Sequence, residues 1–170
     1  MDFYEGLITR RSVRKYTGCK IYEGAIKKIL NAGMYAPSAR DTRPWHFVVI
    51  DDKDILSKVL EFHPYATMLL QASHAIAVCG DENLQNGPGY YVMDCSAAAQ
   101  NMLLAAHSLG LGAVWIGIHP EPDRIEGLSR LLELPSHVKP VALISLGIPV
   151  ESFEPVSQRY EQERIRYNRW

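Results

Sequence analysis

Three arginines and a serine lie within five residues near the start of the sequence: Arg10, Arg11, Ser12 and Arg14. Guanidinium groups bind phosphate oxygens bidentately and a serine hydroxyl adds a compact donor, so the cluster suits a small dianion. A solvated basic turn explains the same spacing, and the residues alone leave both interpretations open. A nucleic-acid patch is disfavoured, because the chain as a whole carries a net charge of −1.

Glycines mark two further places where a ligand could approach the backbone. Gly110-Leu111-Gly112 resembles part of a dinucleotide fingerprint, but an expected helix precedes it and an expected strand follows, which reverses the required order. We therefore interpret Gly110 as a helix cap and Gly112 as a turn residue. Gly117 falls inside a predicted strand, where a glycine either packs closely in a sheet or lets a flat ring lie against the chain.

Recognisable side-chain chemistry is otherwise scarce. The six histidines show no metal-ligand spacing, and there is neither a G-x-S-x-G nucleophile motif nor a P-loop. We expect no metal site and name no catalytic side chain. Any reactivity would therefore come from a bound cofactor.

The length and composition are typical of one folded domain, which we expect to span residues 1–170. Hydrophobic residues make up 47% and charged residues 22% of the chain. The three cysteines are odd in number and widely spaced, which fits a reducing, cytoplasmic setting better than a disulfide framework. Because no stretch of about 18 apolar residues exists, we expect no membrane span.

Periodicity predicts the elements that position these residues. Helices are expected at 22–35, 53–62, 64–71, 90–109 and 122–132, and Asp2 can cap a short first helix with Phe3, Leu7 and Ile8 on its inner side. Apolar, β-branched runs predict strands at 45–50, 74–79, 113–118 and 138–146. Pro140 restricts the last strand to an edge, a bulge or an early position.

The helix predicted at 90–109 is apolar on nearly every side. Such a helix must be buried all round, and a monomer of this size has difficulty enclosing it, so we infer a partner subunit. The last 20 residues mix four Glu and four Arg with aromatic residues. This composition suggests docking onto another surface, with a frayed tail as the alternative.

Several segments, in their order along the chain, resemble the FMN-dependent nitroreductase family. They are RRSVRKY, APSARDTRPWHFVVI, ASHAIAVCGD, MDCSAAAQNMLLAAHSLGLGAVWIGI, LGIP and RIRYNRW. The resemblance implies an α+β fold with a central, mainly antiparallel sheet flanked by helices. It also implies an intertwined homodimer with two FMN sites at its interface, in which residues 150–170 reach across the partner subunit.

The resemblance assigns the basic cluster to one end of the cofactor. Arg10, Arg11 and Ser12 would hold the phosphate and ribityl end of FMN, and Arg159 would close on the phosphate. Arg14 would approach the pyrimidine side of the flavin, where positive charge favours acceptance of a hydride.

Two further segments would complete the site around the flavin ring. Pro37, Ser38 and Ala39 would contact the flavin from the partner subunit. Ile116 and Gly117 would present backbone to the ring near its reactive nitrogen.

The chain departs from the family pattern P-S-x-x-N-x-Q-P-W at two positions. Asp41 stands in place of the Asn, and Arg43 in place of the Gln. An ionised Asp41 cannot donate the hydrogen bond that an amide would donate, so substrate preference is expected to differ. The chain is also too short for the helical insertion that covers the flavin in larger members, and either the site is more open or residues 81–89 cover it.

We therefore expect a flavin oxidoreductase. NAD(P)H would bind transiently and reduce FMN, and a small-molecule acceptor such as a nitroaromatic or a quinone would then enter the same pocket in a ping-pong exchange. The alternatives are an FMN-binding sensor or store without turnover, and a flavin enzyme of this fold for dehalogenation, flavin cleavage or heterocycle dehydrogenation. A helical interaction module without flavin is a further possibility.

Overall fold

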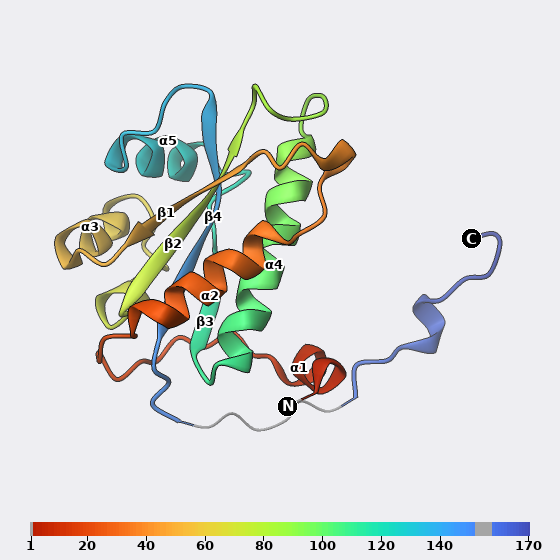
Figure 1. Ribbon diagram of the computed structural model, residues 1–170, viewed down its shortest axis with the longest axis horizontal. Coiled ribbons are helices and arrows are strands. Elements are labelled where there is room, and N and C mark those ends of the chain that lie inside the picture. The colour runs from red at the N-terminus through yellow and green to blue at the C-terminus, as the bar shows by residue number, and fades with distance from the viewer. Residues whose placement is uncertain (1, 152–157) are drawn as a thin grey trace.

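The computed structural model describes residues 2–151 and 158–170 (Figure 1). Its strands are β1 (Trp45–Ile50), β2 (His74–Asp81), β3 (Gly112–Gly117) and β4 (Val138–Gly147). Its α-helices are α1 (Phe3–Thr9), α2 (Glu23–Met34), α3 (Lys53–Lys58), α4 (Tyr90–Ser108) and α5 (Pro122–Leu131). Short 3-10 turns replace the helices expected at 64–71 and at the end of 53–62.

The four strands form one sheet in the order β1-β2-β4-β3, and every neighbouring pair is antiparallel. This confirms the expected α+β class with an antiparallel sheet. Helices α2 and α4 cover one face of the sheet, and α3 and α5 cover the other (Figure 1). The central strand β2 is buried along its whole length, because its alternate side chains enter the two cores.

Pro140 lies in an interior strand, since β4 pairs with β2 on one side and with β3 on the other. The edge position that a proline allows is therefore not used here. The register between β2 and β4 shifts at Val78 and Cys79, where Cys79 faces Pro140 and Val78 faces Ala142. This bulge near the start of the strand accommodates the missing N–H, as the other two alternatives had predicted.

The prediction for the first helix is correct in its cap and wrong in its inner face. Asp2 and Glu5 form a reciprocal capping box at the start of α1. Phe3, Leu7 and Ile8 are nevertheless exposed, with Phe3 at 79%. Because α1 contacts little of its own chain besides α4, its apolar side chains find no core in this subunit.

Helix α4 is buried on one side only within the single chain. Its inner side chains, such as Met102 and Leu103, pack between α2 and the sheet. Met93 is 59% exposed, and Leu104 and Ala105 are half-buried. The all-round burial expected from its composition is thus incomplete in one copy of the chain.

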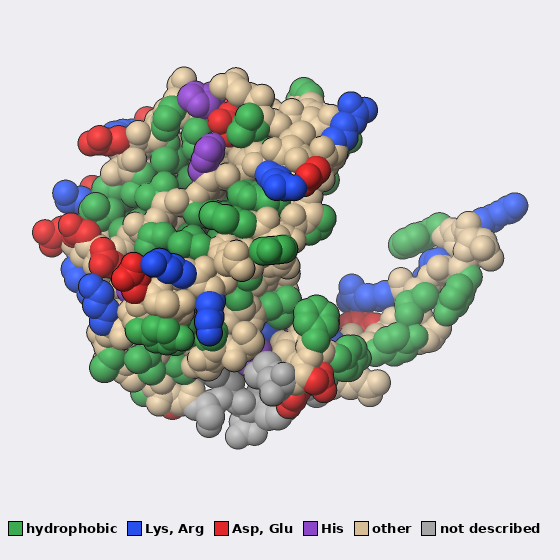
Figure 2. Space-filling model, viewed as in Figure 1, with side chains coloured by type: hydrophobic (Ala, Val, Ile, Leu, Met, Phe, Trp, Pro, Cys, Tyr) green, Lys and Arg blue, Asp and Glu red, His purple; other side chains and the backbone are tan. Residues whose placement is uncertain are grey.

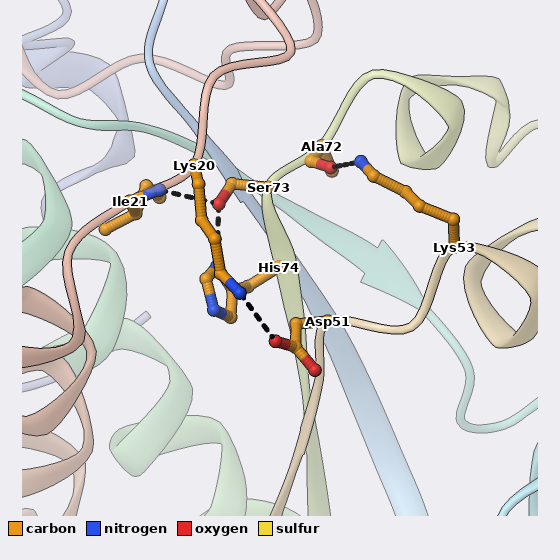
Figure 3. Close-up of polar contacts among 7 residues, drawn as sticks. All are labelled: Lys20, Ile21, Asp51, Lys53, Ala72, Ser73 and His74. Carbon is orange, nitrogen blue, oxygen red and sulfur yellow. Dashed lines mark hydrogen bonds and ion pairs between the residues drawn. The ribbon is translucent and has the colours of Figure 1, made fainter.

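The segment before α2 is tied to one end of the sheet (Figure 3). The Ile21 N–H donates to Ser73 Oγ at 2.8 Å, and the same oxygen lies 2.7 Å from Nδ1 of His74. Lys20 forms an exposed ion pair with Asp51 at 3.2 Å. These contacts fix the start of α2 beside the end of β1 and the beginning of β2.

Tyr16 anchors the amino-terminal segment to the sheet. It is 3% exposed, and its ring fills a notch left by two strand glycines, Gly112 and Gly147. Its hydroxyl donates to the carbonyl of Val13 at 2.7 Å, and burial raises its pKa to about 12. The Val13 N–H in turn donates to the carbonyl of Ala113 at 2.9 Å, so residues 13–16 are fixed along β3 and β4.

Gly147→Ala should lower the free energy of unfolding by about 1–3 kcal/mol, because overpacking a filled notch forces the surrounding atoms to move. The added Cβ would lie 2.7 Å from the Cβ of Tyr16. Gly117→Ala is the matched control in the neighbouring strand, where an added Cβ meets nothing closer than an Arg124 nitrogen at 4.0 Å. Urea unfolding measures both variants, and equal stabilities would contradict the packing of Tyr16 in this notch.

Candidate functional site

The anchored segment carries the basic cluster at its amino-terminal end. Val13 and Tyr16 point into the protein, whereas Ser12 and Arg14 are exposed on the same extended stretch. An Arg14 nitrogen lies 3.5 Å from the carbonyl of Ser12. The alternation of buried and exposed residues therefore presents the polar side chains on the outer side of the segment.

Arg10, Arg11 and Arg159 form a group of interacting positive charges. Burial, followed by the charges of Arg11 and Arg159, lowers the pKa of Arg10. Among residues 2–151 and 158–170, no acidic side chain forms an ion pair with any of these three arginines. The structure thus places Arg10 beside Arg11, and it brings Arg159 of the carboxy-terminal segment close enough for its charge to act on Arg10.

Arg11 is the most incompletely satisfied member of this group. One terminal nitrogen donates to the carbonyls of Ile8 at 3.2 Å and Arg10 at 2.7 Å. Its Nε and its other terminal nitrogen are buried and lack a hydrogen-bond partner among the residues described. Buried donors of a charged group are costly to leave unpaired, so these nitrogens are suited to an anion that the chain itself does not supply.

His107 joins this cluster to α4, and the sequence analysis did not single it out. Its Nε2 lies 2.8 Å from the hydroxyl oxygen of Thr9. Since the Thr9 hydroxyl donates to the carbonyl of Glu5 at 2.7 Å, the imidazole is the donor in the bond between His107 and Thr9. Burial, followed by the charges of Arg10 and Arg11, lowers the pKa of His107.

The segment Pro37–Ala39 lies at the opposite end of α4. The Ala39 N–H donates to Oδ1 of Asp94 at 3.0 Å, and Asp94 is 6% exposed. Ser38 Oγ accepts the N–H of Arg43 at 3.0 Å, which closes the loop on itself. Asp94 was missed as a positioning residue, although a lone acidic residue in an apolar helix was an available signal.

Asp41 and Arg43, the two departures from the family pattern, bind one another. Two guanidinium nitrogens of Arg43 donate to the two carboxylate oxygens of Asp41 at 2.7 and 2.6 Å. The hydrogen bonds from Arg43 lower the pKa of Asp41, which therefore stays ionised. Arg40, Asp41 and Arg43 all have positive φ angles, a conformation that is uncommon outside glycine and concentrates at functional loops.

One chain does not bring the two ends of the site together. Asp94 and His107 are 13 residues apart on α4, which corresponds to about 20 Å along a helix that rises about 1.5 Å per residue. Pro37–Ala39 contacts the Asp94 end, whereas the arginine cluster contacts the His107 end. The distance agrees with the expectation that Pro37, Ser38 and Ala39 serve the site of a partner subunit.

Ile116 and Gly117 lie at the end of β3. Ile116 is buried in the core under α3 and α5, so only its backbone is available to a ligand. Gly117 is half-buried, and an added Cβ would project into open space apart from one Arg124 nitrogen at 4.0 Å. Unlike Gly112 and Gly147, this glycine is not required by packing inside the chain, which favours the interpretation of a ring lying against the backbone.

Residues 81–89 lead from β2 into the start of α4. Asp81 is buried, and its Oδ1 accepts the N–H of Asn83 at 2.8 Å, while its Oδ2 lies 3.5 Å from His46 and 3.8 Å from His137. These contacts hold the base of the loop at the end of α4 that carries Asp94. Coverage of the flavin by this loop stays a prediction.

Neither a metal-ligand group nor a membrane-spanning helix is present in the described part of the chain. No three His, Cys, Asp or Glu side chains in residues 2–151 and 158–170 are grouped so that they could hold a metal ion. In the same part of the chain, no helix combines the length and apolar character needed to cross a bilayer.

Comparison with known proteins decides the family. A sequence profile described as "Nitroreductase family" matches residues 7–75 and 62–148. The chain belongs to the nitroreductase family. This confirms the resemblance drawn from the sequence motifs.

Similar nitroreductase-family proteins match along nearly the whole chain. A protein of Methanothermobacter thermautotrophicus named "Putative NADH dehydrogenase/NAD(P)H nitroreductase" is 49% identical over 170 residues, covering 100% of this chain and 88% of its own. A crystal structure from Parabacteroides distasonis with the same name has a TM-score of 0.93 at 42% identity and covers 98% of both chains. A protein of Desulfovibrio desulfuricans, described as a nitroreductase and solved in complex with FMN, has a TM-score of 0.84 at 30% identity, covering 98% of this chain and 96% of its own.

Acidification should destabilise this nitroreductase-family chain below about pH 6.5, the ordinary pKa of histidine. Burial lowers the pKa values of His63, His74 and His107 in the folded protein. Unfolding therefore takes up protons between those lowered values and about 6.5, so stability is full above this window and is lost as pH falls through it.

Urea unfolding between about pH 7.5 and pH 5 measures this dependence. His107→Gln should decrease the slope of stability against pH, because one of the three imidazoles with a lowered pKa is removed. The pKa values of the paired carboxylates Asp41 and Asp51 are lowered from their usual value of 3.8. Their protonation therefore changes stability only below about pH 3.8, outside the range of this measurement. An unchanged slope in the variant would contradict the assignment to His107.

Proposed function

We propose that this protein is an NAD(P)H-dependent FMN oxidoreductase that acts on a small-molecule acceptor. The observation that carries the proposal is the arginine cluster of Arg10, Arg11 and Arg159, with two buried nitrogens of Arg11 unpartnered. A phosphate dianion satisfies both the charge and the missing acceptors.

The residues present fit FMN at both of its ends. Arg10, Arg11, Ser12 and Arg159 would bind the phosphate and ribityl end, and Arg14 would lie on the pyrimidine side. At the other end of β3, the open backbone of Gly117 would receive the ring. When bound, FMN supplies the capacity to accept a hydride from NAD(P)H and to pass electrons to a second substrate.

A second copy of the chain would complete each site. The distance of about 20 Å between the two ends of α4 means that Pro37, Ser38 and Ala39 would contact a partner's flavin rather than their own. Exposed apolar side chains on α1 and α4 offer surface for such a homodimer. The chain would then act as a single FMN-binding domain of residues 1–170.

The carboxy-terminal segment would extend over the partner subunit. Residues 158–170 stand off the body and expose Tyr160, Tyr167 and Trp170 together with several arginines (Figure 2). Part of the proposed tail, residues 152–157, lies outside the described residues. Aromatic side chains in this position are suited to an interface that one chain does not provide.

The chain's own groups would position the substrates and exclude water rather than act as nucleophiles. Burial raises the pKa of the Cys79 thiol to about 12 and raises the pKa of Cys95 as well. Thiolate chemistry is therefore excluded at these two residues. Alternate binding of NAD(P)H and a nitroaromatic, quinone or related acceptor in one pocket needs only flat rings held against the flavin face.

The names of relatives support this activity class. The Methanothermobacter relative is named for NADH and NAD(P)H chemistry, and a 27% identical Bacillus subtilis protein is named "FMN reductase [NAD(P)H]". The Desulfovibrio structure holds FMN. FMN is printed for the Bacillus and Desulfovibrio proteins and NAD(P)H for the Methanothermobacter and Bacillus proteins, and the names do not agree on one acceptor.

Arg10→Ala should weaken FMN binding by about 10- to 150-fold, the equivalent of about 1.5–3 kcal/mol for a charged hydrogen bond. Fluorescence titration of FMN into the apoprotein measures the Kd. Arg130→Ala is the matched control, because Arg130 lies on α5, is exposed and forms an ion pair with Glu126. Equal affinities in the two variants would return Arg10 to the role of a solvated basic residue.

NADH or NADPH, added anaerobically to the FMN-loaded protein, should bleach the visible absorbance of the flavin. Addition of a nitroaromatic or a quinone should then restore the absorbance, as a ping-pong exchange requires. Failure of both nucleotides to bleach a flavin that dithionite does reduce would exclude the pyridine-nucleotide half of the proposal and favour a sensor or store.

A further inference from the structure

The carbonyl of Gly117 accepts two hydrogen bonds from side chains of other segments. Nε2 of His63 lies 3.1 Å from this oxygen, and a terminal nitrogen of Arg124 donates to it at 3.0 Å. Since a carbonyl can only accept, Nε2 of His63 carries a proton. Three separate parts of the chain, the end of β3, the turn after α3 and the first turn of α5, thus meet at one oxygen atom.

Burial keeps the His63 side chain in this contact. It is 4% exposed, and its Nδ1 is buried without a partner among the described residues. The backbone N–H of His63 donates to the carbonyl of Val59 at 2.9 Å, and this bond fixes the turn that carries His63. Burial, followed by the charge of Arg124, lowers the pKa of His63, so the ring donates as a neutral imidazole.

Arg124 occupies a position that local structure does not favour. It lies in the first turn of α5, where the helix dipole disfavours a positive charge. Among residues 2–151 and 158–170, no acidic side chain forms an ion pair with it. One of its nitrogens lies 4.0 Å from the place of a Gly117 Cβ, at the border of the open space over that glycine.

We propose that Arg124 and His63 are positioning residues for the flavin ring. Together they hold the Gly117 peptide so that its open face receives the ring, and Arg124 adds a positive charge beside that face. The inference rests on the proposed function, because it concerns the ring end of the same FMN site. Neither residue touches the phosphate cluster, which lies at the other end of β3.

The position of Arg124 has an electrostatic consequence. Reduction of a flavin by a hydride adds negative charge to the ring, and a fixed guanidinium at its edge stabilises that charge more than it stabilises the oxidised form. Arg124 should therefore raise the midpoint potential of the bound flavin while contributing little to the retention of FMN. His63 should contribute to the orientation of the peptide without adding charge.

The test compares the midpoint potentials of FMN bound to wild type, Arg124→Gln and Arg124→Lys, with Arg130→Gln as a control on the exposed side of the same helix. Arg124→Gln should shift the oxidised-to-reduced equilibrium at least tenfold toward the oxidised form, which is about 30 mV for a two-electron couple. Arg124→Lys should recover most of this shift, and Arg130→Gln should show none. The Kd for FMN should change less than threefold in all of them.

A second readout needs no flavin. In the apoprotein, Arg124→Gln should raise the pKa of His63, followed by NMR titration of its ring protons, because the neighbouring positive charge is lost. If Arg124→Gln does not fold, Arg124→Met supplies a second neutral variant for both measurements.

The outcomes separate the two proposals. A wild-type protein that takes up no FMN would overturn the proposed function and this assignment with it. A wild type that binds FMN, together with an Arg124→Gln variant of unchanged potential, would overturn the assignment alone. A lowered potential that lysine does not recover would show that the charge of Arg124 is not the cause.

Discussion

The contact between Tyr16 and the glycine notch of β3 and β4 is the constraint on which the site depends. A tyrosine ring can lie this close to two strands only because Gly112 and Gly147 lack side chains. Its hydroxyl and the neighbouring N–H of Val13 then fix residues 13–16 along the sheet. The arginines that precede this anchor, Arg10 and Arg11, are held at half-buried positions because the anchor itself is buried. A surface loop with the same arginines would move too freely to hold several charged hydrogen bonds at once.

Helix α4 links the parts of the site and also keeps them apart. His107 near its carboxyl end contacts the segment that carries Arg10 and Arg11, and Asp94 near its amino end holds the loop of Pro37–Ala39. A rigid helix of this length prevents one chain from folding both groups around one small ligand. Apolar side chains are left exposed on α1 and α4, and in the proposed homodimer a second copy would cover them. Dimerisation and completion of the ligand site are therefore one event in the proposed function.

In the proposed site, the ring end would be built from the opposite side of the sheet. Ile116 enters the core beneath α3 and α5, and the carbonyl of Gly117 is held by His63 and Arg124, which precede and follow β3 in the sequence. The proposed phosphate end would depend on charge, whereas the proposed ring end would depend on a peptide that is held in place and left uncovered. The pair of Asp41 and Arg43 adds a third kind of contact, an ion pair at the surface of a loop with positive φ angles.

Local pattern alone determined much of this protein. The strand at 45–50 was predicted to the residue, and the other strands and the helices at 22–35, 90–109 and 122–132 to within about two, because periodicity decides which side chains a helix or a strand can bury together. The sequence also indicated the arginine cluster as a candidate anion site, since the spacing of the arginines along the chain does not depend on the fold. Tertiary structure alone decided which side chains contact one another and which stay exposed. Pro140 lies inside the sheet because a bulge receives it, Phe3 is exposed because no core of its own chain reaches α1, and Asp41 pairs with Arg43 because the loop turns back on itself. Asp94, His107, His63 and Arg124 became candidate site residues only when folding placed them beside Ala39, Thr9 and Gly117, since a hydrogen bond across many residues leaves no periodic trace in the sequence.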